Sequence, residues 1–389
     1  MVGVRAALAV PLSSLLLVLT ACAQPEGDPE GLGTQDTGPQ PTTQTGQPTS
    51  PDQEPSPEAS SPEGPGRPRV VGTVARGLAA PWGITFLPDG TALVGERDTT
   101  RVLAIPAGGG RPRAIGQVGI AAPQGEAGLL GLAASPTYDA DSLVYAYVST
   151  AEDNRVVRME YADGRLGAPD PVLTGIPNGF IHDGGRLLFA EDGNLFVSTG
   201  ETGEEQLAQD RDSLAGKILR ITPDGDPAPG NPLAGSPVWT MGHRNVQGLA
   251  FDDAGELWAS EFGDSTWDEL NRIDEGRKYG WPLHEGKAPT ADRYRDPFVQ
   301  WRTSEASPSG LAFHEGSLWM ASLRGQRLWQ VPVTDDGVGK PRDWFVGDYG
   351  RMRTVVVAPD GNLWLTTSNR DGRGDPAPQD DRILEVAIR

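Results

Sequence analysis

The sequence has little of three features that common functional classes require. It contains one cysteine in 389 residues, so no disulfide can form within the chain. It contains four histidines, none in HxH or HExxH spacing, which argues against a zinc site built from histidine. It also lacks a positive net charge: 33 basic residues stand against 53 acidic ones, for a formal charge of −20. A nucleic-acid binder needs a basic face, so this class is disfavoured and no nucleic-acid partner is expected.

The N-terminus lacks an apolar run of full membrane-spanning length. Arg5 is the only charged residue before Glu26, and the apolar stretch at 7–19 is shorter than the ~20 residues of a spanning helix. A positive start, a short apolar stretch and a small-residue exit are typical of a signal peptide, here residues 1–21. The exit, Leu-Thr-Ala-Cys, ends at Cys22 and resembles a bacterial lipobox, which implies lipidation of Cys22. We expect an exported protein anchored to the outer face of the cell membrane through this lipid alone. The alternative is plain secretion with an incidental cysteine.

Residues 22–66 lack the apolar side chains that folding requires. After Cys22 this segment has one leucine, no aromatic residue, eight acidic residues and no basic one. Such a composition cannot bury enough apolar area to offset the entropy of ordering, so we expect a disordered acidic tether rich in proline, threonine and glycine.

From residue 67 to residue 389 the chain repeats one phrase, a turn followed by a short strand of alternating hydrophobicity. Examples are LPDGTALVGE at 87–96 and APDGNLWLTT at 358–367. The turns fall at positions 90, 141, 193, 255, 316 and 361, which are 45 to 62 residues apart. This period predicts an all-β fold, a six-bladed β-propeller of four-stranded blades. The strand-like segments 69–78 and 382–389 could share one blade and close the ring. A pair of β-sandwiches is the alternative, but sandwiches do not usually repeat one phrase six times.

Propeller sites lie on loops at the central channel, so the residues beside the repeated strands are the candidates. His182 sits in the glycine-bordered phrase Ile-His-Asp-Gly-Gly just before a repeat strand. Imidazole suits a general base because its ordinary pKa lies near working pH. Glu201 follows the next strand and could fix the histidine tautomer. The alternatives are a turn residue for His182 and a surface acid for Glu201.

Basic residues stand at comparable places in three further repeats. They are Arg244 with the adjacent donor Asn245, then Arg324, and finally Arg351 and Arg353, which are two residues apart and so face one side of a strand. Arginines gathered in one channel repel each other unless an anion lies among them, and guanidinium binds carboxylates through a bidentate fork. The implied ligand is a small polyanion. Taken singly, each arginine could instead pair with a nearby acid.

The loop from Glu261 to Asn271 combines acids with irregular backbone. Carboxylate and carbonyl oxygens suit Ca²⁺, which is a hard cation. The calcium-binding loop pattern D-x-D-x-D-G is absent, so this composition alone is a weak signal.

Taken together, these phrases resemble the pyrroloquinoline quinone (PQQ)-dependent aldose sugar dehydrogenases, the soluble glucose/sorbosone dehydrogenase family. The resemblance runs from about residue 75 to the C-terminus, and family members are six-bladed propellers. The phrases that carry it are PWGITFLPDG (81–90), GEAGLLGLAASP (125–136), HDGGRLLFAEDGNLFVSTGE (182–201), SLAGKILRI (213–221), GHRNVQGLAF (242–251), DELNRI and YGWP (within 268–282), SPSGLAF (307–313) and GRMRTVVVAPDGNLWL (350–365).

The resemblance implies a role for each candidate. His182 matches the base that takes a proton from the anomeric hydroxyl as hydride passes to PQQ, and Glu201 stands where the family usually has the orienting Asp. The cofactor-binding matches are Arg244, Asn245, Arg324, Arg351, Arg353 and Glu126, the last of which replaces a frequent Gln. The calcium matches are Gly263 and Asp264 for the active-site ion, and Glu269 with the backbone of Tyr279 for a structural ion.

The resemblance thus implies an extracytoplasmic quinoprotein that oxidises an aldose to its lactone, with PQQ and Ca²⁺ as cofactors and an unknown electron acceptor. Two other functions stay open at this point: a non-catalytic propeller that binds glycan or protein at the cell surface, and a Ca²⁺-dependent lactonase. Glu126 favours the first of these, because it places a negative charge near a trianion. The lactonase would not explain Arg351 and Arg353. The sequence does not name the sugar, whose contacts we expect from loops such as 283–300 and 333–349.

Overall fold

The computed structural model describes residues 66–290 and 293–389. The predicted signal peptide (1–21), Cys22 and the tether up to residue 65 lie outside the described residues, so these assignments stay predictions. Within the described residues, no helix is long and apolar enough to cross a membrane.

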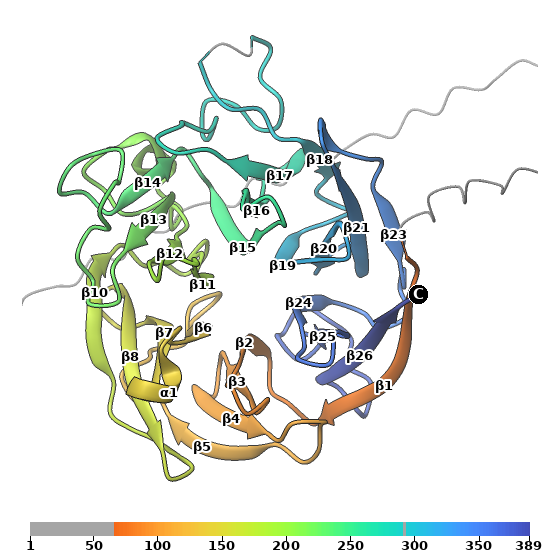
Figure 1. The fold of residues 1–389 in the computed structure, drawn as a ribbon. Coiled ribbons are helices and arrows are strands. Elements are labelled where there is room, and N and C mark those ends of the chain that lie inside the picture. The colour runs from red at the N-terminus through yellow and green to blue at the C-terminus, as the bar shows by residue number, and fades with distance from the viewer. Residues whose placement is uncertain (1–65, 291–292) are drawn as a thin grey trace, which may run out of the picture. The chain divides into compact units, whose positions relative to one another are not determined.

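Six antiparallel sheets stand around a central axis, each sheet forming one blade of a propeller (Figure 1). The inner strands are β2 (Pro81–Phe86), β6 (Leu129–Ala134), β11 (Leu187–Phe189), β15 (Asn245–Phe251), β19 (Pro308–His314) and β24 (Met352–Val357). The second strands are β3 (Ala92–Glu96), β7 (Leu143–Ser149), β12 (Leu195–Ser198), β16 (Leu257–Phe262), β20 (Ser317–Ser322) and β25 (Leu363–Thr367).

The outer half of each blade follows the same order. The third strands are β4 (Arg101–Ile105), β8 (Asn154–Ala162), β13 (Lys217–Ile221), β17 (Trp267–Ile273), β21 (Arg327–Thr334) and β26 (Arg382–Ile388). The outermost strands are β5 (Arg113–Gln117), β10 (Asp170–Ile176), β14 (Val238–Met241), β18 (Val299–Arg302), β23 (Arg342–Trp344) and β1 (Pro68–Arg76). Two sheets carry a short extra strand, β9 (Arg165–Leu166) or β22 (Gly337–Val338), and the helical turns are α1 (Tyr138–Asp141) and a 3₁₀ segment at Glu205–Gln209.

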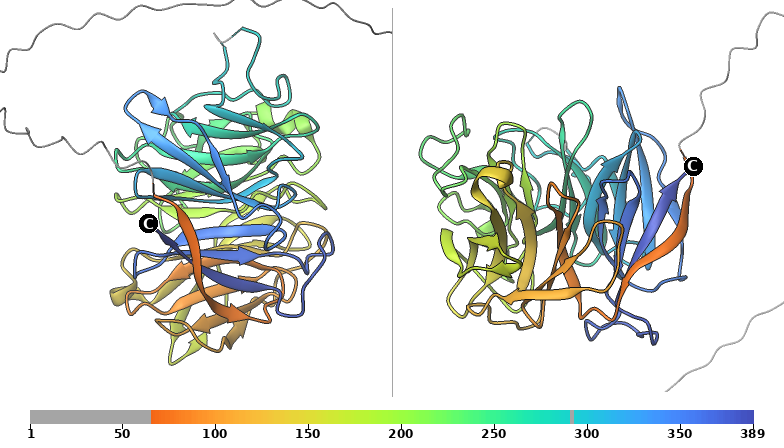
Figure 2. Two further views of the ribbon diagram at one scale, coloured as in Figure 1. Left: turned by 90° about the vertical axis from the view of Figure 1, so that its right-hand side faces the viewer. Right: turned by 60° about the horizontal axis from the view of Figure 1, so that its bottom comes forward.

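The ring closes by pairing the first described strand with the last. β1 runs antiparallel to β26, with Pro68 opposite Ile388 and Arg76 opposite Arg382. Figure 2 shows the two strands side by side from two further directions. The prediction of a six-bladed ring with a shared closing blade is therefore confirmed.

The apolar core is divided into six clusters, and each cluster fills the space between two adjacent blades. Between the fifth and sixth blades, for example, Trp319 and Leu328 pack against Leu363 and Leu384. Fully burying one such side chain contributes ~2–3 kcal/mol. Every blade therefore packs against both of its neighbours, and closure of the ring covers both faces of every sheet.

The strand registers define two ends of the channel. At one end each inner strand finishes and turns into the second strand; the six predicted turns lie here, and we call it the turn end. At the other end the start of each inner strand pairs with the finish of its second strand, for example Asn245 with Phe262 and Met352 with Thr367. We call this the site end, because the candidate residues lie on its loops or among the first residues of the strands that begin there.

Candidate functional site

His182 and Glu201 meet at the site end of the third blade. His182 precedes β11, Glu201 follows β12, and His182 Nδ1 lies 2.6 Å from Glu201 Oε1. The Glu201 side chain is 1% exposed, and its other oxygen, Oε2, has no hydrogen-bond partner among the described residues. When Nδ1–H donates to this carboxylate, the imidazole Nε2 carries no proton and can accept one. The geometry therefore suits proton transfer at His182 Nε2.

The backbone of His182 adopts a conformation that side-chain-bearing residues rarely use. Its φ is 59°, in the left-handed region, which costs on the order of 1 kcal/mol and persists only where neighbours hold it. Three contacts do so: Thr202 N donates to His182 O at 3.2 Å, His182 N donates to Glu126 Oε2 at 3.0 Å, and Asn245 Oδ1 accepts from Gly184 N at 3.0 Å. Asn245, expected at the cofactor, thus supports the loop that carries the base.

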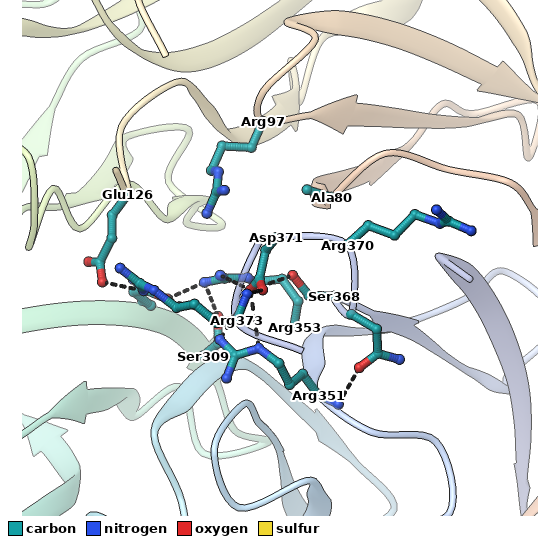
Figure 3. A network of polar contacts seen from close by, with 12 residues as sticks. Ala80, Arg97, Glu126, Ser309, Arg351, Arg353, Ser368, Arg370, Asp371 and Arg373 are labelled. Carbon is teal, nitrogen blue, oxygen red and sulfur yellow. Dashed lines mark hydrogen bonds and ion pairs between the residues drawn. The ribbon is translucent and has the colours of Figure 1, made fainter. Parts of the chain in front are cut away.

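Arg351 and Arg353 converge on one carboxylate that the sequence analysis did not select, Asp371. Arg351 donates to Asp371 Oδ2 from Nε at 3.2 Å and from Nη2 at 3.0 Å, and Arg353 Nη2 lies 3.8 Å from the same oxygen. Figure 3 shows Asp371 between the two guanidinium groups. Burial raises the pKa of Asp371, but Arg351 and Arg353 outweigh it and hold this pKa below its ordinary value.

A further guanidinium, that of Arg186, is buried near Arg351 and Arg353, which we call the arginine cluster. It stacks at 4.2 Å on the ring of Trp82 and donates from Nε to Gln247 O at 2.9 Å, while Arg353 donates to Gln247 Oε1 at 2.8 Å. Desolvation lowers the pKa of Arg186 and of Arg353 to about 9 each. Arg351 and Arg353 share the single charge of Asp371, and Arg186 has no ion-pair partner among the described residues. This part of the channel is cationic and suits an anion.

Glu126 does not stand free as a negative charge at the channel. Its Oε1 accepts from Arg373 Nη1 at 2.8 Å and its Oε2 accepts from the His182 amide. Desolvation raises the pKa of Glu126, but these two donors outweigh it and lower the pKa below its ordinary value. Arg373 therefore balances the charge that the sequence analysis counted against a trianionic ligand.

Arg244 immediately precedes β15 in the fourth blade and lies beside the predicted calcium loop. Its Nη1 donates to Gly263 O and its Nη2 to Asp264 Oδ1 at 3.0 Å, while its Nε is buried without a partner among the described residues. The Trp281 ring lies 5.2 Å from the guanidinium carbon. The structure thus brings Arg244 together with Gly263 and Asp264, and the Gly263 carbonyl accepts one hydrogen bond from the arginine.

The residues of the second predicted calcium site are also engaged within the chain. Glu269 accepts from Gly286 N at 2.7 Å and from Asn271 Nδ2 at 2.9 Å, and the Tyr279 carbonyl accepts from Gln209 Nε2 at 3.0 Å. Desolvation and the nearby Glu261 carboxylate raise the pKa of Glu269 to about 8. The described residues contain no cluster of three or more acidic, histidine or cysteine side chains that could hold a metal, so this calcium site stays a prediction.

Arg324 is the predicted cofactor residue that the structure leaves apart. It follows β20, is exposed, and makes no hydrogen bond or ion pair within the described part of the chain. Its role at a cofactor stays a prediction.

The comparisons with known proteins decide the family. The glucose/sorbosone dehydrogenase family matches residues 78–375. The chain belongs to this family. A PQQ-bound aldose sugar dehydrogenase from Streptomyces coelicolor superposes with a TM-score of 0.81 at 53% identity, covering 83% of this chain and 98% of that one. The aldose sugar dehydrogenase YliI of Escherichia coli is 28% identical over 76% of this chain and 89% of its own length. Quinoprotein glucose dehydrogenase B of Acinetobacter calcoaceticus is 30% identical over 53% of this chain and 50% of its own length.

In this member of the family, sequence reasoning missed Arg97, Asp371 and Arg373. Arg97 follows β3, donates from Nε to Asp98 at 2.6 Å, and points toward the cluster in Figure 3. Asp371 follows β25 and Arg373 lies two residues further on. The rule that selected Glu201, a polar residue just after a second strand, also selects Arg97 and Asp371 when it is applied to every blade.

Proposed function

We propose that this protein is a PQQ-dependent sugar dehydrogenase that oxidises aldoses at the anomeric carbon to lactones. Membership of the family and the 53% identity to a PQQ-bound aldose sugar dehydrogenase support this. The observation that carries the proposal is the juxtaposition of an oriented His182–Glu201 pair with arginines that outnumber their carboxylate.

The side chains present fit such a cofactor. PQQ carries three carboxylates, and Arg351 and Arg353 offer forked donors for them, with the charge of Arg186 nearby. Three buried polar atoms around the site also lack partners among the described residues: Arg244 Nε, Trp281 Nε1 and Glu201 Oε2. Buried polar atoms normally have partners, so these atoms are consistent with a polar ligand.

The residues of the chain would divide the work as follows. His182 Nε2 takes the proton of the anomeric hydroxyl, and Glu201 stabilises the imidazolium that forms. Arg351 and Arg353 bind and orient the cofactor carboxylates, and Asp371 holds these two arginines in place. When bound, PQQ supplies the hydride acceptor.

Calcium belongs to the same proposal with one condition. Backbone oxygens of Gly263 and Asp264 are hard ligands of the type that Ca²⁺ takes, and a bound ion would act as a Lewis acid. Because the positive charge of Arg244 lies against the Gly263 oxygen and opposes a second cation there, we expect calcium to bind this site only together with the anionic cofactor. Calorimetric titration of calcium with and without PQQ tests this condition.

The direct test is reconstitution of the cofactor-free protein. With PQQ and Ca²⁺ added, we expect aldose-dependent reduction of an artificial electron-accepting dye. If PQQ does not bind, the enzyme proposal fails, and a non-catalytic propeller that binds glycan or protein remains. If PQQ binds but no aldose is oxidised, the substrate assignment fails.

Export and anchoring are proposed on the sequence alone. We infer that Cys22 carries a lipid that holds the protein at the outer face of the cell membrane. Expression of the full chain and a Cys22→Ser variant, followed by fractionation and fatty-acid labelling, tests this: the label and membrane retention should both be lost in the variant. The electron acceptor is then sought among extracytoplasmic carriers.

A further inference from the structure

A continuous path of hydrogen bonds connects a loop of the sixth blade to the backbone of His182. Arg373 Nη1 donates to Glu126 Oε1 at 2.8 Å, and His182 N donates to Glu126 Oε2 at 3.0 Å. We propose that Arg373 is a positioning residue for the His182 base and acts through Glu126. The proposal rests on the function proposed above for the role of His182, but the contacts themselves exist in the cofactor-free protein.

His182 needs such support because of its backbone conformation. A residue with φ of 59° returns to a more favourable region unless its peptide groups are held. Glu126 holds the amide of His182, and its own amide donates to Phe180 O at 3.0 Å, so Glu126 fixes the loop at two points. The carboxylate of Glu126 can serve the amide only when its own rotamer is fixed, and Arg373 fixes it from the other oxygen.

Arg373 is presented by a loop that is itself tied down. Residues 368–381 connect β25 to β26, and the Asp371 side chain in this loop is 1% exposed and accepts from Arg373 N at 3.0 Å. The base of the loop is closed by Asp381, which accepts from Asn369 N at 2.6 Å. Figure 3 shows Asp371 turned into the arginine cluster and Arg373 extended toward Glu126. The loop thus holds Asp371 beside Arg351 and Arg353, and Arg373 beside Glu126.

This arrangement accounts for a charged residue, Glu126, at this position. A glutamine could accept the His182 N–H through its amide oxygen, but it would bring no charge for Arg373. Glu126 and Arg373 form a pair of zero net charge at 18% and 46% side-chain exposure. The acid and the arginine are therefore expected to act as one unit.

The test uses amide hydrogen exchange of His182 in the cofactor-free protein, with five variants. In Arg373→Gln we expect exchange at the His182 amide to accelerate about two- to fivefold, the range for a partly exposed ion pair. Arg373→Lys should restore most of the protection. In a Glu126→Gln background, Arg373→Gln should have no further effect. Arg342→Gln removes an exposed arginine from β23 on the outside of the ring and serves as the matched control.

Kinetics of the reconstituted enzyme give a second readout. Arg373→Gln should lower kcat by about the same factor with KM unchanged, since the base is displaced while the substrate site is kept. Unchanged His182 exchange in Arg373→Gln, or additive effects of the two substitutions, would overturn the proposal. If the wild-type protein oxidises no aldose while the exchange results hold, the proposed function fails and the structural coupling stands.

Discussion

The two ends of the same strands differ in what their glycines do. At the turn end, Gly193, Gly255, Gly316 and Gly361 have φ between 68° and 84°, and a Cβ added to any of them would meet nothing within 4 Å. At the site end, a Cβ on Gly200 would lie 1.9 Å from His182 O, and one on Gly184 would lie 2.5 Å from Thr199 C. The first set serves turn geometry, whereas the second permits close packing around the base.

This difference separates fold from function along the chain. The turn end repeats because every blade needs the same reversal, and the repetition identifies the fold. The site end differs between blades, because a different polar residue precedes each of four inner strands: Glu126 before β6, His182 before β11, Arg244 before β15 and Arg351 before β24. Departures from the repeat therefore mark the site.

The largest effect should follow from removing the base. We expect His182→Ala to lower kcat ~10²–10⁴-fold while PQQ binding is retained, because only the proton acceptor is lost. His314→Ala, at the turn end of β19, is the matched control and should keep full activity. Steady-state dye reduction and equilibrium PQQ binding measure both quantities. The enzyme account fails if His182→Ala turns over normally.

The next effect concerns the arginine cluster. Arg351→Met removes a forked charge-assisted donor, worth about 1.5–3 kcal/mol, so PQQ affinity should fall about 10- to 100-fold. Arg220→Met removes a turn-end arginine that pairs with Asp192 and should leave the affinity unchanged. Tryptophan fluorescence during a PQQ titration gives both dissociation constants. Equal affinities in the two variants would place the cofactor elsewhere.

Glycine substitutions at the two ends test directly whether the ends differ in function. Gly200→Ala overpacks the site end, so we expect a loss of about 1–3 kcal/mol in the free energy of unfolding together with a loss of activity, because His182 O must move. Gly361→Ala strains a φ of 84° in open space and should cost about 1 kcal/mol with kcat unchanged. Denaturant unfolding and kinetics of both variants measure the contrast. If Gly361→Ala alters kcat as much as Gly200→Ala does, the two ends are not functionally distinct.

A pH dependence of stability provides a further contrast between the two ends. Desolvation raises the pKa of Asp183 to about 7, whereas the unfolded carboxyl titrates near its ordinary 3.8. Between these values the folded state binds more protons, so the free energy of unfolding should fall as pH rises, by up to ~4 kcal/mol for this group. Asp183→Asn should flatten the fall, and Asp360→Asn at the turn end should not. Urea unfolding at pH 4.5 and pH 7.5 tests this, and identical slopes in all three proteins would contradict it.

The sequence predicted the repeated hairpins but not the contacts between side chains that lie far apart in the chain. Turn glycines and alternating strands predicted six blades and the closing pair, because local patterns determine hairpins. Glu201 was found because it lies just after a repeat strand, and the same rule applied to the sixth blade selects Asp371 but not its partners. Asp371 and Arg373 lie in an irregular loop, and their partners Arg351 and Glu126 are 20 and 247 residues away in sequence. No local period encodes such contacts, so only the closed ring reveals that Arg373 balances Glu126.

Reduction of bound PQQ by an aldose, followed by absorbance in a single turnover without added dye, tests the central claim most directly. The account predicts that wild-type protein converts one equivalent of bound quinone to its reduced form, and that His182→Ala binds the same equivalent but reduces it ~10²–10⁴-fold more slowly. Equal rates of reduction in the two proteins, or reduction of free quinone alone, would contradict it.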